Sequence, residues 1–198
     1  HNGDVVIMVE GEGVIEVNIF LSPVAEKVHG PVGGTKASVP EMPANFSEGT
    51  RGEIEKIGST KKGNLVQARA LASYTRRHLE YSNDSSFNEL YDSDPKGYFG
   101  AIDEQKKADC DVANTYFAAL CAKLNIPTRH VVGHSVKGKD MDGRSQITSG
   151  TGHAWTEVWD DTANQWVRAF RWSRIDATPP GDPNLEEEQL KGPNQKVP

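Results

Sequence analysis

The chain has 198 residues, of which 36% are hydrophobic, and its formal net charge is −6 at pH 7. This length and composition predict one domain with a moderate core and an added segment, and the acidic balance gives no reason to expect nucleic acid as a partner. No apolar run approaches the roughly 20 residues that a membrane-spanning helix needs, so we expect no membrane span in this chain.

Residues 1–60 are predicted to form a β-rich N-terminal extension or the end of a preceding domain. The segment DVVIMVEGEGVIEVNIFL is rich in strand-forming residues on both sides of a glycine-containing turn, and a stretch rich in proline and glycine follows it. The chain begins with HNGDVV, without an initiating methionine, which suggests that it is part of a larger polypeptide or a processed protein.

A helix is predicted from Asn64 onward, because residues that suit a buried face recur there at helical spacing. Arg69, Arg76 and Arg77 are expected to project from this helix toward solvent. We expect the helix to pack beneath the functional site. Its predicted inner face comprises Leu65, Ala68, Leu71, Ala72, Tyr74, Thr75 and Leu79.

A second helix is predicted from about Cys110 to about Leu124, with Asp109 as its N-cap. Cys110 then lies in the first turn, where free backbone N–H groups and the helix dipole stabilise a thiolate. The alternative is that Cys110 is a small buried hydrophobic residue. Cys121 lies eleven positions along the same helix, about 16 Å away and too far for a disulfide, so we expect it to be an inert core thiol.

A strand is predicted to begin at His153, because the following segment AWTEVW alternates between two faces. DDTANQ supplies a turn and WVRAF a second strand, which together predict a hairpin. Gly150 and Gly152 permit a close approach of the backbone in front of the imidazole. The polar loop of residues 137–150 is a candidate wall for substrate entry, and a solvated loop is the alternative. Considered alone, His153 could equally be a structural histidine.

Asp176 is predicted to lie at a strand end, since Thr178, Pro179 and Pro180 stop the strand behind it. A carboxylate at that point can accept a hydrogen bond from an imidazole, although an ordinary turn aspartate is the alternative. Together, Cys110, His153 and Asp176 supply a nucleophile, a base and a group that orients the base.

The motifs ADC, GHAWTEVW and DATPP occur in this order, and the chain resembles the transglutaminase-like superfamily from about Asn64 to Pro180. The resemblance implies an α+β fold, papain-like, in which the nucleophile helix packs on an antiparallel β-sheet. It assigns Cys110 as nucleophile, His153 as general base and Asp176 as the residue that orients His153. No cofactor and no metal ion are expected.

The resemblance also implies a division of the chain and a chemistry. We expect the catalytic core over residues 61–181 and a polar tail or linker over residues 182–198. The compartment is not determined by these features, and relatives favour an extracytoplasmic or secreted location. The implied reaction is acyl transfer through a thioester on a protein or peptide substrate, with hydrolysis favoured over protein-glutamine cross-linking. A non-catalytic binding module and a structural role stay open.

Further site residues are expected around this triad. The backbone N–H of Cys110 is a candidate oxyanion donor, because it points to where negative charge develops during acyl transfer. Tyr81 is a second candidate donor, with packing as its alternative role. Trp155, beside His153, is expected to form a wall of the site and shield it from water.

Overall fold

The computed structural model describes residue 39, residues 45–84, residues 87, 90, 93 and 94, and residues 97–135, 149–160 and 172–182. The predicted N-terminal hairpin, most of the polar loop before His153 and the predicted strand WVRAF lie outside these residues. The described elements, in chain order, are α1 (Glu48–Thr60), α2 (Asn64–His78), β1 (Glu80–Tyr81), α4 (Tyr98–Gln105), β2 (Lys107–Ala108), α5 (Cys110–Lys123), β3 (Thr128–His134), the 3₁₀ turn η2 (Ser149–Thr151), β4 (Gly152–Trp159) and β5 (Trp172–Ile175).

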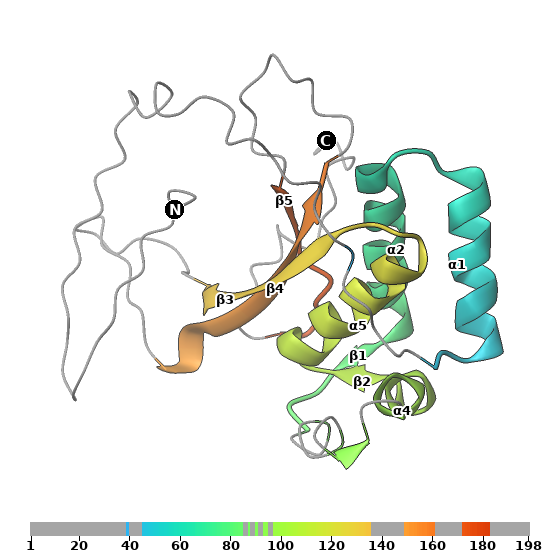
Figure 1. The fold of residues 1–198 in the computed structure, drawn as a ribbon. Coiled ribbons are helices and arrows are strands. Elements are labelled where there is room, and N and C mark those ends of the chain that lie inside the picture. The colour runs from blue at the N-terminus through green and yellow to red at the C-terminus, as the bar shows by residue number, and fades with distance from the viewer. Residues whose placement is uncertain are drawn as a thin grey trace, which may run out of the picture. The chain divides into compact units, whose positions relative to one another are not determined.

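The predicted α+β fold is confirmed. An antiparallel sheet with strand order β3-β4-β5 packs against α5, and β1 and β2 form a separate parallel pair (Figure 1). Strand β4 alternates as predicted from Ala154 onward, because one face is buried toward α5 while Trp155, Glu157 and Trp159 on the other are only partly covered. The buried face of β4 consists of Ala154, Thr156 and Val158.

Helix α2 packs against α5, and α1 packs against α2 (Figure 1). The start of α2 at Asn64 is as predicted, and Arg69 and Arg77 are exposed. The prediction that Arg76 faces solvent is wrong. Arg76 is half-buried and its Nη1 donates a hydrogen bond of 2.6 Å to the carbonyl oxygen of Asp176, because the chain after β5 passes alongside α2.

Helix α1 was not predicted, and it begins before residue 61, where we expected the catalytic core to start. Its N-cap is Ser47, whose hydroxyl accepts a hydrogen bond of 3.3 Å from the backbone N–H of Thr50. Only Thr50, Ile54 and Ile57 are buried along its 13 residues. So few buried positions, in a segment that also contains charged residues and glycines, give only a weak helical period in the sequence, which is why the helix was missed.

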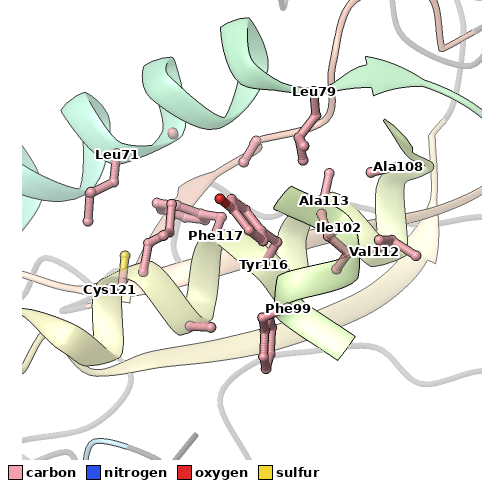
Figure 2. Packing of buried hydrophobic residues seen from close by; sticks show 14 of the residues in the cluster. Leu71, Leu79, Phe99, Ile102, Ala108, Val112, Ala113, Tyr116, Phe117 and Cys121 are labelled. Atoms are coloured by element: carbon pink, nitrogen blue, oxygen red, sulfur yellow. The ribbon is translucent and has the colours of Figure 1, made fainter. Parts of the chain in front are cut away.

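Helix α5 is buried along most of its length and forms the centre of the core (Figure 2). The predicted helix from about Cys110 to about Leu124 is therefore confirmed to within one residue. Cys121 is completely buried among apolar side chains, and this burial raises the pKa of its thiol well above the ordinary value. The prediction of an inert core thiol at Cys121 agrees with this environment. In the described part of the chain no helix is long and apolar enough to cross a membrane.

Candidate active site

Cys110 is the first residue of α5 and is only partly buried. Asp109 precedes it with an extended backbone, and its Oδ1 accepts a hydrogen bond of 2.8 Å from the N–H of Val112, which confirms Asp109 as the N-cap. The residue before the cap, Ala108, pairs with Tyr81 across the β1–β2 ladder. The thiol is therefore fixed at a helix N-terminus, where backbone N–H groups favour a negative charge.

His153 lies near the start of β4, and its side chain is fully buried. Its Nε2–H donates a hydrogen bond of 2.6 Å to Oδ2 of Asp176. Because Nε2 is engaged by Asp176, Nδ1 is the ring nitrogen left for Cys110. The Sγ of Cys110, a ring nitrogen of His153 and a carboxylate oxygen of Asp182 all lie within 4.8 Å of one another.

Asp176 directly follows β5 and is held by several donors. Its Oδ1 accepts hydrogen bonds from the hydroxyl of Thr178 at 2.6 Å and from the backbone N–H of Thr178 at 3.1 Å. Burial alone would raise the pKa of Asp176, but the hydrogen bonds from His153 and Thr178 outweigh it and lower the pKa to about 2. The structure thus brings an ionised carboxylate against the imidazole.

The imidazole of His153 has charged neighbours on both sides. Burial alone would lower its pKa, but the interactions with Asp176 and with Cys110 outweigh burial and raise the pKa to about 9. His153 is consequently protonated at neutral pH. A thiol at a helix N-terminus beside an imidazolium is the environment in which a cysteine acts as a nucleophile.

Asn114 is a site residue that the sequence analysis missed. It is completely buried on α5, one helical turn after Cys110. Its Nδ2 lies 2.9 Å from the carbonyl oxygen of Cys110 and 3.0 Å from that of Ala154, and its Oδ1 accepts a hydrogen bond of 3.1 Å from the N–H of Ala177. The sequence did contain one indication of this residue, an amide side chain on an otherwise apolar face of the predicted helix.

Asp182 was assigned to the polar tail, but it lies at the site. The aspartate is buried, and its Oδ2 is 3.5 Å from Nδ1 of His153. Gly181 precedes it with a φ of 105°, a conformation that side chains other than glycine rarely adopt. This turn directs the chain back toward the imidazole. The sequence signal was the pair Gly-Asp directly after two prolines.

Tyr81, the candidate oxyanion donor, lies on β1 close to the site. Burial raises its pKa, and the negative charges of Asp182 and Cys110 add to this effect, which brings the pKa to about 12. The phenol therefore keeps its proton near neutral pH. In this structure the hydroxyl donates a hydrogen bond of 2.9 Å to Oδ1 of Asn83.

Trp155 lies beside His153, as its place in the sequence predicted. The two rings are stacked at an interplanar angle of 25°, with centroids 6.2 Å apart, and the guanidinium of Arg174 lies 4.4 Å from the centroid of the indole. Gly133 makes room for this indole, because a Cβ there would lie 2.8 Å from the Trp155 ring. Trp155 thus fills the space between the imidazole and a cation on β5.

The family model of the transglutaminase-like superfamily matches residues 54–177, more than half of the chain. No curated protein sequence matches the chain.

Two solved structures are similar to the chain. The crystal structure of the periplasmic domain of TgpA from Pseudomonas aeruginosa has a TM-score of 0.45 and 14% identity, covering 67% of this chain and 43% of that one. A crystal structure described as a TGase has a TM-score of 0.39 and 21% identity, covering 68% of this chain and 34% of that one. The chain therefore spans less than half the length of either protein.

Proposed function

Because the chain belongs to the transglutaminase-like superfamily, whose fold supports cysteine-dependent catalysis, we propose that it cleaves peptide or glutamine amide bonds through a thioester on Cys110. Water is the acceptor in this proposal, and the substrate is a protein or peptide. Cys110 is the nucleophile, His153 the general acid and base, and Asp176 the residue that orients His153.

One observation supports the proposal most directly. The buried imidazole of His153 bonds Asp176 through Nε2 at 2.6 Å, which leaves Nδ1 on the side of the helix-terminal thiol. With the pKa of His153 raised to about 9, the imidazolium carries the proton that a leaving amine requires. Asp176, with a pKa of about 2, stays ionised throughout.

Acylation begins when the Cys110 thiolate attacks the carbonyl carbon of the amide. The carbonyl oxygen takes on negative charge, and the backbone N–H of Cys110 is the proposed donor to that oxygen. The tetrahedral intermediate then collapses as Nδ1–H of His153 protonates the leaving nitrogen. The C–N bond breaks, the amine departs and a thioester remains.

Deacylation reverses the proton movement. Neutral His153 removes a proton from water, the hydroxide attacks the thioester carbon, and the C–S bond breaks to release the acid and the Cys110 thiolate. Water is the default acceptor because it is in large excess over any amine, and amine transfer requires a site that binds the amine and excludes water from the thioester. Tyr81 and Trp155 are proposed to line this space.

Mass spectrometry of casein incubated with the full chain tests the proposal. Wild type and Cys110→Ala are compared, each with and without a biotinylated primary amine. We expect cleavage or deamidation of casein that depends on Cys110, without amine incorporation. Cys121→Ala serves as the matched thiol control and should keep activity, because that sulfur is buried in the core.

Other outcomes lead to other assignments. Amine incorporation that depends on Cys110 would make the protein a cross-linking transglutaminase. Absence of any reaction, combined with equally slow alkylation of both cysteines, would contradict acyl transfer and favour a binding module.

A further inference from the structure

Three side chains at the site place possible metal-ligand atoms close to one another. These atoms are Sγ of Cys110, Nδ1 of His153 and Oδ2 of Asp182, and the groups offered by these residues lie within 4.8 Å of one another. Nδ1 is fully buried and makes no hydrogen bond of normal geometry within the described residues. When Nδ1 carries no proton, its lone pair, the sulfur and the carboxylate repel one another unless a cation lies between them.

We propose that Cys110, His153 and Asp182 form a Zn²⁺ site that holds the enzyme in an inactive state. The inhibitory consequence rests on the proposed function, whereas the binding of zinc does not. Asp182 is the residue that distinguishes this site from the triad, since Asp176 lies on the opposite edge of the imidazole.

The spacing of the ligand atoms fits a tetrahedral zinc ion. Zn–N and Zn–O bonds of about 2.0–2.2 Å at a tetrahedral angle separate the nitrogen and the oxygen by about 3.3–3.5 Å. The Nδ1–Oδ2 separation between His153 and Asp182 is 3.5 Å. Sγ of Cys110 lies within 4.8 Å of the other two ligand atoms, and its side chain is only partly buried, which leaves it room to change rotamer.

The outer partner of the imidazole also fits metal binding. A histidine that binds zinc through one ring nitrogen usually donates the other N–H to a carboxylate, which fixes the tautomer and orients the ring. Asp176 accepts that hydrogen bond from Nε2 of His153 at 2.6 Å. In the neutral form of His153 the proton is then on Nε2 and the lone pair is on Nδ1, which faces Cys110 and Asp182.

The chemistry of the three ligands favours zinc over harder cations. Thiolate and imidazole suit Zn²⁺, whereas Ca²⁺ and Mg²⁺ prefer sites built from oxygen atoms. Three protein ligands leave a fourth tetrahedral position for water. Binding releases the proton that Nδ1 holds in the thiolate–imidazolium pair. A sulfur bonded to zinc cannot attack a carbonyl carbon, and an Nδ1 bonded to zinc cannot carry a proton.

Competition with a chromophoric zinc chelator, on the reduced full chain, tests the proposal without any measurement of turnover. We expect wild type to bind one zinc ion per chain, Cys110→Ala to lose this binding, and Asp182→Asn to bind at least about tenfold more weakly. Asp111→Asn is the matched control and should bind like wild type. Asp111 is also on α5 and pairs with a histidine, His130, at 2.9 Å, but that pair has no thiol.

A second readout identifies the sulfur. Co²⁺ in place of zinc should give thiolate charge-transfer absorption in wild type and in Cys121→Ala, and none in Cys110→Ala.

Circular dichroism checks that each variant folds, and Asp182→Ser replaces Asp182→Asn if the latter does not. Equal zinc affinity in wild type and the folded Asp182 variant would overturn the proposal, as would the absence of binding to reduced wild type. Zinc binding without any acyl-transfer activity would support the site and contradict only the proposed function.

Discussion

Nδ2 of Asn114 lies 3.3 Å from Oδ1 of Asp176, so the helix that begins at Cys110 also contacts the carboxylate that pairs with the imidazole of His153. The same amide nitrogen is 3.2 Å from the hydroxyl of Thr178, which donates to that carboxylate. One buried side chain therefore links α5 to the segment after β5. The relative positions of Cys110 and Asp176 are set within the core rather than at the surface.

Replacing Asn114 with alanine should destabilise the fold. The change leaves the buried N–H of Ala177 without its acceptor, and we expect the free energy of unfolding to fall by about 2–4 kcal/mol. Urea unfolding at pH 7 measures this. Gln67→Ala is the control, since Gln67 donates to backbone carbonyls near the surface and should cost less than about 1 kcal/mol. If both variants lost the same free energy of unfolding, the hydrogen bonds of Asn114 would not contribute more to stability than those of a residue near the surface.

The two cysteines should differ in reactivity. Iodoacetamide at neutral pH should alkylate Cys110 at least about tenfold faster than Cys121, because a thiolate at a helix N-terminus reacts and a fully buried thiol does not. His153→Ala should slow the reaction of Cys110 by removing the imidazolium. Peptide mapping by mass spectrometry measures both rates. Equal slow alkylation of both thiols in wild type would disprove the thiolate–imidazolium pair.

Asp176→Asn should preserve the fold and abolish most activity. The amide is nearly the same size as the carboxylate, but it neither stabilises the imidazolium nor holds the same tautomer, so turnover should fall by about 10³–10⁴-fold. Turnover is measured on the substrate identified with casein, and thermal unfolding serves as the control for folding. Full turnover in this variant would place the orienting group elsewhere.

Two adjacent arginines on α2 offer a matched comparison. Arg76→Gln removes the hydrogen bond from Nη1 to the carbonyl oxygen of Asp176, so it should lower turnover and reduce the free energy of unfolding by about 1–3 kcal/mol. Arg77→Gln changes an exposed side chain and should alter stability by less than about 0.5 kcal/mol. Denaturant titration and turnover, measured on both variants, check the difference. Equal stability and equal turnover in the two variants would contradict a role for the Arg76–Asp176 hydrogen bond.

A buried carboxylate on α4, Asp103, should make stability depend on pH. Asp103 accepts hydrogen bonds from Thr50 at 2.8 Å and from the backbone N–H of Ser47 at 2.7 Å, and also contacts His78 and Tyr116. Burial alone would raise the pKa of Asp103, but these hydrogen bonds outweigh burial and lower the pKa from 3.8 to about 2.

The sign of the effect follows from that lowered pKa. The folded state holds the proton less tightly than the unfolded state, so the contribution of Asp103 is present above about pH 4 and is lost as the pH falls toward 2. Its size is about 2 kcal/mol. Urea unfolding of wild type and Asp103→Asn should therefore differ at pH 7, and the difference should shrink as the pH falls from about 4 toward about 2. A constant difference across this range would exclude Asp103 as its cause.

The sequence predicted those parts of the molecule whose signal is local. Helix α5 has a capping aspartate and apolar residues at helical spacing, and β4 alternates between a buried and a partly covered face. These patterns arise within one element, so they are readable without knowing what the element packs against. The same holds for Asp176, whose place at a strand end follows from the prolines behind it.

The missed residues depend on contacts between distant segments. Asn114 and Asp182 contact partners that are tens of residues away in the sequence, and no local period marks a polar residue that will be buried. Arg76 was assigned to solvent for the same reason, since its acceptor follows β5. Each of these side chains belongs to the segment after β5 or contacts it. The path of that segment depends on the tertiary fold, so a local sequence pattern does not reveal these contacts.

Helix α5 is the most deeply enclosed helix described here, and Cys110 stands at its first position. Segments enclosed in a core exchange their amide hydrogens only when the whole domain opens. The amides of this helix should therefore exchange at the rate of global unfolding. The surroundings of the Cys110 thiol therefore persist for as long as the domain stays folded, and a substitution that speeds global unfolding should shorten that time.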